Sequence, residues 1–135
     1  MTPSDRLTAE ILLAVSKEFP YVVLWRNNRI DAMAVGAGGT MRRVKAGIDG
    51  QGDLTGIALS RSGVGLRLEI EVKTGKDGLS KAQRRFRNMI VQHGGIYIVA
   101  RNVEDTLAAL GQYSQRNRQL RDHQEPGQDG RYTGI

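Results

Sequence analysis

The strongest regular pattern in the chain is a strict alternation of aliphatic and charged residues between positions 66 and 73. Successive side chains of a β-strand point to opposite faces, so this segment predicts a strand with one apolar face and one charged face. The aliphatic positions are Leu66, Leu68, Ile70 and Val72, and the charged positions are Arg67, Glu69, Glu71 and Lys73. We expect the aliphatic face to fill a core and the charged face to carry the chemistry.

A different period, typical of a helix, marks the N-terminal segment. Thr2 can cap a helix, Pro3 suits its first position, and Asp5 stands where the acid of a capping box belongs. Apolar residues then recur at helical spacing, which predicts a helix to about Glu18, before Pro20. Glu10 falls at the edge of the apolar stripe, so we expect its carboxylate to face the protein or a cleft.

Two more helices are indicated by capping residues in the second half of the chain. Ser80-Lys81-Ala82-Gln83 reads as a capping box. The helix that follows is expected to bury Ala82, Phe86, Met89 and Ile90 and to end at Gly94. Asn102 is expected to cap a shorter helix that ends at Gly111.

Three further segments, 21–25, 54–59 and 96–100, are rich in β-branched and aliphatic residues and predict strands. The last of them is almost wholly apolar, as expected for a strand covered on both faces. The succession of strand 66–73, helix and strand 96–100 suggests a right-handed βαβ unit. We therefore expect an α/β domain over residues 1–111.

Two regions are poorly patterned. In segment 30–46, several glycines suggest a loop followed by a basic edge strand or arm at 41–45. Residues 112–135 form a polar extension, expected to be helical to about Arg121 and loose from Pro126 onward.

Composition narrows the possible functions. The 135 residues carry 20 Lys and Arg against 14 Asp and Glu, and the net charge of +6 suggests an anionic partner, first of all nucleic acid. The absence of cysteine excludes disulfides, thiol nucleophiles and cysteine-ligated zinc. No segment has the length of apolar sequence needed to span a bilayer or the layout of a signal peptide, so we expect a cytoplasmic protein with no membrane partner.

The candidate chemistry lies on the charged face of strand 66–73. Glu71 and Lys73 share that face, and Asp53 directly precedes the neighbouring strand. Two carboxylates on adjacent strands can hold Mg²⁺ or Mn²⁺ together with water molecules. An ammonium beside such a metal suits phosphodiester hydrolysis. Glu69 shares the face, and we expect it to pair with Arg67 or another cation rather than to bind metal.

Glu10, Asp53, Glu71-Val72-Lys73 and Ser80-Lys81-Ala82-Gln83, in this order, resemble the PD-(D/E)xK nuclease superfamily, and within it a virus-type replication-repair nuclease (VRR-NUC) domain. The resemblance covers about residues 10–110. It departs from the superfamily pattern at Gly52, where a proline often precedes the first acid, and the aromatic expected after the glutamine stands as Phe86.

This resemblance implies a restriction-endonuclease-like core, with a central mixed β-sheet flanked by α-helices. It implies catalytic roles for Glu10, Asp53, Glu71, Lys73 and Gln83, and a metal held by Asp53, Glu71, Glu10 and the backbone carbonyl of Val72. Stand-alone members are small phage or bacterial homodimers that cut branched DNA, such as four-way junctions, with Mg²⁺ or Mn²⁺. Gln83 can equally be a capping residue without a catalytic role.

Basic residues near the predicted site are candidates for DNA binding, because neutralising phosphates gives affinity without reading sequence. Trp25 is expected in the core rather than as a stacking platform for bases. The candidate DNA-binding residues are Arg26, Arg42, Arg43, Lys45, Lys81, Arg84, Arg85 and Arg87.

The residues thus predict a metal-dependent DNA endonuclease, and the resemblance implies that it is selective for branched DNA and dimeric. Two alternatives stay open. One is a non-catalytic nucleic-acid-binding module that uses the same basic surface. The other is a sequence-specific, restriction-type nuclease.

Overall fold

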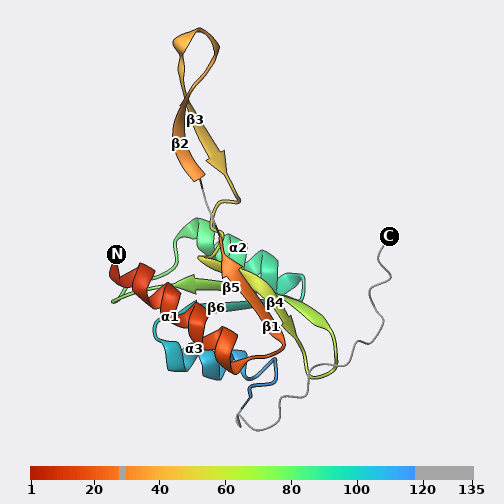
Figure 1. Ribbon diagram of the computed structural model, residues 1–135. Helices are drawn as coiled ribbons and strands as arrows, with labels where there is room; N and C mark the ends of the chain where they lie inside the picture. Colours follow the sequence, from red (N-terminus) through yellow and green to blue (C-terminus); the bar gives the residue numbers. More distant parts are fainter. Residues whose placement is uncertain (28–29, 118–135) are drawn as a thin grey trace.

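A computed structural model describes residues 1–27 and 30–117 of the chain. Its centre is a four-stranded sheet in the order β1-β4-β5-β6 (Figure 1). Strand β4 pairs antiparallel with both β1 and β5, whereas β6 lies parallel to β5. The sheet is therefore mixed, as expected. Its strands span Val22–Arg26 (β1), Leu54–Leu59 (β4), Gly65–Val72 (β5) and Ile96–Ala100 (β6).

Three helices flank this sheet, and each begins at the capping residue that the sequence indicates. In α1, the Thr2 side chain accepts a hydrogen bond from the Asp5 amide while the Asp5 carboxylate accepts one from the Thr2 amide. Ser80 and Gln83 form the same reciprocal pair at α2. Asn102 caps α3. The helices span Pro3–Glu18 (α1), Lys81–Gln92 (α2) and Val103–Leu110 (α3).

Helices α1 and α3 cover one face of the sheet and form the main core with it. Alternate residues of β5 point into this core, and Leu68 and Ile70 are fully buried. From α1, Ile11 and Val15 pack against them, and from α3 Leu107 does so. The alternation at 66–73 therefore sorts the aliphatic side chains into the core, as expected.

Helix α2 links β5 to β6 and packs on the opposite face, chiefly against β6. Its buried side chains are Phe86 and Ile90. Met89, which the helical spacing placed with them, is 37% exposed, so that expectation is wrong. Only two side chains of α2 are buried, so the surface of the helix that contacts the sheet is narrower than the helical spacing suggested. Met89 lies outside this contact surface.

A second, two-stranded sheet projects from the central domain (Figure 1). Strands β2 (Ile30–Val35) and β3 (Met41–Ala46) pair antiparallel around a 3₁₀ turn, in which Gly38 and Gly39 adopt positive φ angles of 82° and 79°. The expected basic arm is present as β3, but the sequence missed β2. A hairpin with described residues 33–43 exposed throughout has no buried face, so its sequence needs no alternation of apolar and polar residues.

The first part of the C-terminal extension differs from expectation. Residues 112–117 contain turns and a single β-bridge between Ser114 and Ser60 rather than a helix. Ser114 is fully buried, and Arg116 forms an ion pair with Glu18 of α1. These polar contacts with the domain hold the segment in an irregular path. The predictions for residues 118–135 lie outside the described residues.

Candidate active site

Asp53 and Glu71 face each other across neighbouring strands. Leu54 at the start of β4 pairs with Ile70 of β5, so Asp53, one residue earlier, stands opposite Glu71. Asp53 turns its carboxylate toward β5, where Oδ2 accepts a hydrogen bond of 2.7 Å from the amide of Val72. The Asp53 side chain is exposed, whereas Glu71 is only 6% exposed. An open carboxylate thus lies beside a buried one.

Two donors hold the Glu71 carboxylate. The side-chain amide of Gln83 donates a hydrogen bond of 2.8 Å to Oε1, and the ammonium of Lys73 lies 3.4 Å from the same oxygen. Gln83 also accepts a 2.8 Å hydrogen bond from the backbone amide of Ser80. The capping box of α2 therefore positions Glu71, so the capping and site roles of Gln83 coincide in one side chain.

Glu69, one pleat away on the same face, has different partners. Its Oε2 accepts a 3.2 Å hydrogen bond from the Gly52 amide, and its Oε1 forms an ion pair with Arg67. The pairing with Arg67 is the expected one, although the sequence gave no sign that Glu69 would be fully buried. A buried carboxylate needs such partners to offset its desolvation. Through its hydrogen bond with Gly52, Glu69 thus helps to fix the position of the loop that precedes Asp53.

The backbone of loop 47–52 explains why glycine precedes Asp53. A Cβ atom at Gly52 would lie 2.8 Å from the carbonyl oxygen of Ile70 and 3.0 Å from Oε2 of Glu69. Proline at this position would also lack the amide that Glu69 binds. At Gly50, with φ of 82°, a Cβ would lie 2.1 Å from the carbonyl oxygen of Ala82. Close packing of this loop on the start of α2 brings Asp53 and Gln83 to one place.

Asn27 anchors the loop that precedes Asp53. Its side-chain amide donates to the Gly52 carbonyl at 3.0 Å, and its oxygen accepts from Gln51 at 2.9 Å. Its backbone amide donates to the carbonyl oxygen of Asp53 at 2.9 Å. These three contacts extend the pairing of β1 and β4 by one residue and fix the position of Asp53. A single asparagine after a short strand carries no pattern that would have singled it out.

Two buried hydroxyls lie next to the acidic residues, and sequence reasoning missed both. Thr55, Glu69 and Tyr97 stand opposite one another on β4, β5 and β6. The hydroxyl oxygens of Thr55 and Tyr97 are buried and have no hydrogen-bond partner among the described protein atoms. Burial raises the pKa of the Tyr97 hydroxyl, and the nearby charges of Glu71 and Glu69 act in the same direction. The Tyr97 hydroxyl therefore stays neutral beside the carboxylates.

The expectation that the Glu10 side chain is turned toward the protein is wrong. Glu10 is exposed on α1, where the nearby Leu13 is 73% exposed as well. The apolar stripe of α1 is thus narrower than the helical spacing suggested. Within residues 1–27 and 30–117, no three Asp, Glu, His or Cys side chains form a group that could hold a metal ion. A contribution of Glu10 to a metal site stays a prediction.

The remaining oxygen donors fit Mg²⁺ or Mn²⁺. The amide and carbonyl of one strand residue point to the same side, so the Val72 carbonyl points the same way as the amide that binds Asp53. Asp53, Glu71 and this carbonyl form a donor set made of oxygen alone. Mg²⁺ is commonly bound by one or two carboxylates and keeps several waters, so it does not need a larger protein cage.

The candidate DNA-binding residues divide between three places. Helix α2 carries four cations and no acid, with Lys81, Arg84 and Arg85 exposed and Arg87 half-buried. On the hairpin, Arg42 and Arg43 are exposed, and Lys45 lies opposite Asp31 in the register. Arg26 pairs with Leu54, which places it on the α1 side of the sheet. Only the first two groups flank the acidic pair.

The expectation that Trp25 lies in the core is wrong. Its side chain is 46% exposed. Core positions on β1 are those that face α1, such as Val22, and Trp25 alternates with them. It therefore points to the face that carries the acidic residues.

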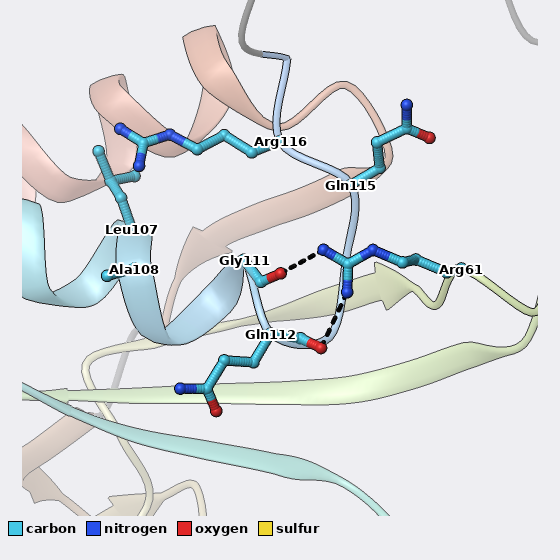
Figure 2. A pocket seen from close by; sticks show the side chains of 7 residues that line it. All are labelled: Arg61, Leu107, Ala108, Gly111, Gln112, Gln115 and Arg116. Atoms are coloured by element: carbon cyan, nitrogen blue, oxygen red, sulfur yellow. Dashed lines mark hydrogen bonds between the residues drawn. The ribbon is translucent and has the colours of Figure 1, made fainter.

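A pocket of about 400 Å³ lies at the far end of β5 from the acidic pair (Figure 2). Arg61, in the turn between β4 and β5, donates hydrogen bonds to the carbonyl oxygens of Gly111 and Gln112. Arg116 on the opposite wall pairs with Glu18 and Glu104. Arg61 thus satisfies carbonyl oxygens after α3, and Arg116 offsets two carboxylates, so we assign the pocket a structural role.

No helix in the described part of the chain has the length and apolar character required to cross a membrane. Comparisons with protein-family models, curated proteins and solved structures found no match to this chain. The function must therefore be inferred from the geometry of the site and from the resemblance of its motifs.

Proposed function

We propose that this protein is a metal-dependent DNA endonuclease that hydrolyses phosphodiester bonds. The observation that carries the proposal is the arrangement of Asp53, Glu71 and Lys73 at one end of the sheet. Two carboxylates stand opposite each other on adjacent strands, and the lysine ammonium lies 3.4 Å from Glu71. A module that only binds phosphates would gain nothing from an acidic pair at its centre, because carboxylates repel the DNA backbone.

The chain's own residues would divide the work as follows. Asp53, Glu71 and the Val72 carbonyl would hold the metal, which when bound polarises a phosphoryl oxygen and favours ionisation of a water molecule. Lys73 would stabilise the negative charge that develops on the phosphate as water attacks and the P–O bond breaks. Gln83 would keep Glu71 oriented through its 2.8 Å hydrogen bond. Tyr97 on β6, opposite Glu69, stays neutral beside the carboxylates.

The basic groups suit contacts with the DNA backbone on either side of the acidic pair. The hairpin and the start of α2 lie at the same end of the sheet as Asp53 (Figure 1). Arg42 and Arg43 on the hairpin and the cations of α2 would bind phosphates, and such contacts make affinity strongly dependent on salt. They carry no base readout, which favours recognition of DNA shape over sequence.

Preference for branched DNA and a homodimeric state belong to the proposal through the resemblance to VRR-NUC domains. The hairpin exposes Met33, Val35 and Met41 by 58%, 70% and 58%, and an isolated two-stranded hairpin is marginally stable in water. A partner that covers this arm would stabilise it. Sedimentation of the protein over a range of concentrations tests the dimer.

The second candidate function is non-catalytic binding of nucleic acid. It is favoured by the finding that Oε1 of Glu71 already accepts a hydrogen bond from Gln83 and forms an ion pair with Lys73. A binder of this kind would use the same cations without a metal. Ligand linkage separates the two, because a metal that binds only the folded state raises the melting temperature.

The test is a cleavage assay on a four-way junction, a flap, a linear duplex and a single strand, each in Mg²⁺, Mn²⁺ or EDTA. We expect cleavage with either metal, none in EDTA, and the highest rate on branched DNA. Equal rates on all four substrates would remove the preference for branches but keep the nuclease. Absence of cleavage on every substrate, with no change of melting temperature in millimolar metal, would favour the binder.

A further inference from the structure

The face of the sheet that carries the acidic pair is only half covered. Helix α2 packs mainly on β6. On the β1 and β4 side of the same face, three large apolar side chains are exposed: Val23 by 64%, Trp25 by 46% and Ile57 by 51%. We call these three residues the open apolar patch.

The strand register places the open apolar patch beside the acidic pair. Val23 stands opposite Ile57, and Trp25 stands opposite Thr55, which in turn stands opposite Glu69. Directly opposed residues point to the same face of a sheet. Asp53 and Glu71 form the next row on that face, so Trp25 lies one pleat from the row that holds the site.

The patch has cationic as well as acidic neighbours. Arg67 stands opposite Ile57 and its side chain is 50% exposed. Arg87 of α2 is half-buried and lies close enough to Tyr97 for its charge to interact with the Tyr97 hydroxyl. Tyr97 belongs to the same row of side chains as Trp25. An exposed aromatic ring with partly exposed cationic side chains nearby suits a nucleotide, because the base can stack on the ring while the phosphate contacts the cations.

We propose that Trp25 stacks on an unpaired base of the DNA that is cut at the acidic pair, an inference that rests on the proposed nuclease function. Val23 and Ile57 extend the apolar surface on which the nucleotide lies. Bases inside a continuous duplex are stacked on each other and cannot reach the ring. The patch therefore selects DNA in which a base near the scissile bond is unpaired, as at a flap, a gap or an opened branch point.

The chain offers a direct probe, because Trp25 is its sole tryptophan. Its fluorescence is titrated in EDTA with a single-stranded oligonucleotide, a flap and a blunt duplex of equal length. We expect strong quenching by the first two and little by the duplex. Replacing the unpaired nucleotides of the flap by abasic sites is expected to remove the quenching while leaving the phosphates in place.

Binding of labelled DNA provides the second readout. Trp25→Ala is expected to weaken binding of single strands and flaps by about 5- to 100-fold, the range found for loss of one base–aromatic stack. Its affinity for the blunt duplex should stay the same, and Trp25→Phe should retain most of the affinity. Leu13→Ala serves as the matched control, since Leu13 is an exposed apolar residue on the other side of the molecule. Circular dichroism checks that each variant is folded.

Two results would overturn the inference, and a third separates it from the proposed nuclease function. If Trp25→Ala binds and cleaves flaps as wild type does, stacking is wrong while the nuclease stands. If the emission shifts to the blue with rising protein concentration in the absence of DNA, and Trp25→Ala abolishes the associated dimer, the patch is a protein interface. If quenching by unpaired DNA occurs but no metal supports cleavage, the base platform stands and the nuclease proposal fails.

Discussion

The two faces of the central sheet bury different kinds of side chain, although the same strands supply both. Toward α1 and α3, alternate residues such as Leu68 and Ile70 are fully buried among other aliphatic side chains. Toward α2, the alternate side chains include two buried carboxylates and two buried hydroxyls for which the described residues offer no hydrogen-bond partner. The first arrangement stabilises the fold, whereas the second costs free energy unless its charges are offset. The difference indicates that the α2 face is kept for function.

The largest expected effect comes from removing the open carboxylate of that face. Asp53→Asn keeps the shape of the side chain and its hydrogen bond with Val72 but loses the charge that would hold a metal. We expect the single-turnover rate of DNA cleavage to fall by about 10³-fold, on the scale of losing a key electrostatic group. The melting temperature should not fall, because two neighbouring negative charges become one. Asp77→Asn, in the exposed loop before α2, is the control and should cleave normally. Full activity of Asp53→Asn would contradict the assignment.

The apolar face is tested by truncating one of its central residues. Ile70→Ala should lower the free energy of unfolding by about 2–5 kcal/mol, because it removes buried methyl groups and leaves a cavity. Ile57→Ala, at an exposed position on the other face, should change it by less than about 1 kcal/mol. Urea denaturation monitored by circular dichroism gives both values. Similar losses for the two variants would show that the two faces do not differ as described.

A third comparison separates the two buried carboxylates of β5. Glu71→Gln should reduce the rate of cleavage by about 10²-fold. It should leave the fold intact, since the side-chain oxygen of the new amide can still accept the hydrogen bond from Gln83. Glu69→Gln leaves Arg67 without its partner and weakens the tie to Gly52, so it should lower the melting temperature more than it lowers the cleavage rate at temperatures where it is folded. The reverse pattern would mean that Glu69, and not Glu71, serves the reaction.

The smallest effect concerns Tyr97. Burial beside Glu71 and Glu69 raises the pKa of its hydroxyl above the ordinary value of 10.0. The folded protein therefore retains a proton that the unfolded chain releases, so stability present below about pH 10 is lost as the pH rises above it. Melting temperatures measured from pH 9 to 11 should fall more steeply for wild type than for Tyr97→Phe. Parallel curves would show that the hydroxyl is not buried beside the carboxylates.

Much of the fold could be predicted because each element carries a local signal. The capping residues Thr2, Ser80 and Asn102 mark the starts of α1, α2 and α3, and the alternation at 66–73 sorts the two faces of β5. Strand β2 and the course of residues 112–117 could not be predicted. The described part of the hairpin has no buried face that would require apolar and polar residues to alternate. Residues 112–117 are held by contacts between residues distant in sequence, such as the ion pair of Arg116 with Glu18.

The candidate site was only partly predictable for the same reason. Glu71 and Lys73 share a face by strand geometry alone, and the pairing of Glu69 with Arg67 follows from their spacing on one strand. The opposition of Asp53 and Glu71 depends on the register between two strands, which the sequence does not specify. The bond from Gln83 to Glu71, the anchor at Asn27 and the exposure of Trp25 depend on tertiary packing. No local pattern encodes how far α2 covers the sheet.

Cleavage by wild type and by Lys73→Ala, on the DNA structure that wild type cuts fastest, tests the central claim most directly. Rates are measured in Mg²⁺ and in Mn²⁺, with DNA binding and melting temperature recorded for both proteins. The account predicts that Lys73→Ala folds and binds this DNA but that its cleavage is almost abolished in either metal. Normal cleavage by Lys73→Ala would contradict the assignment of the active site to Asp53, Glu71 and Lys73.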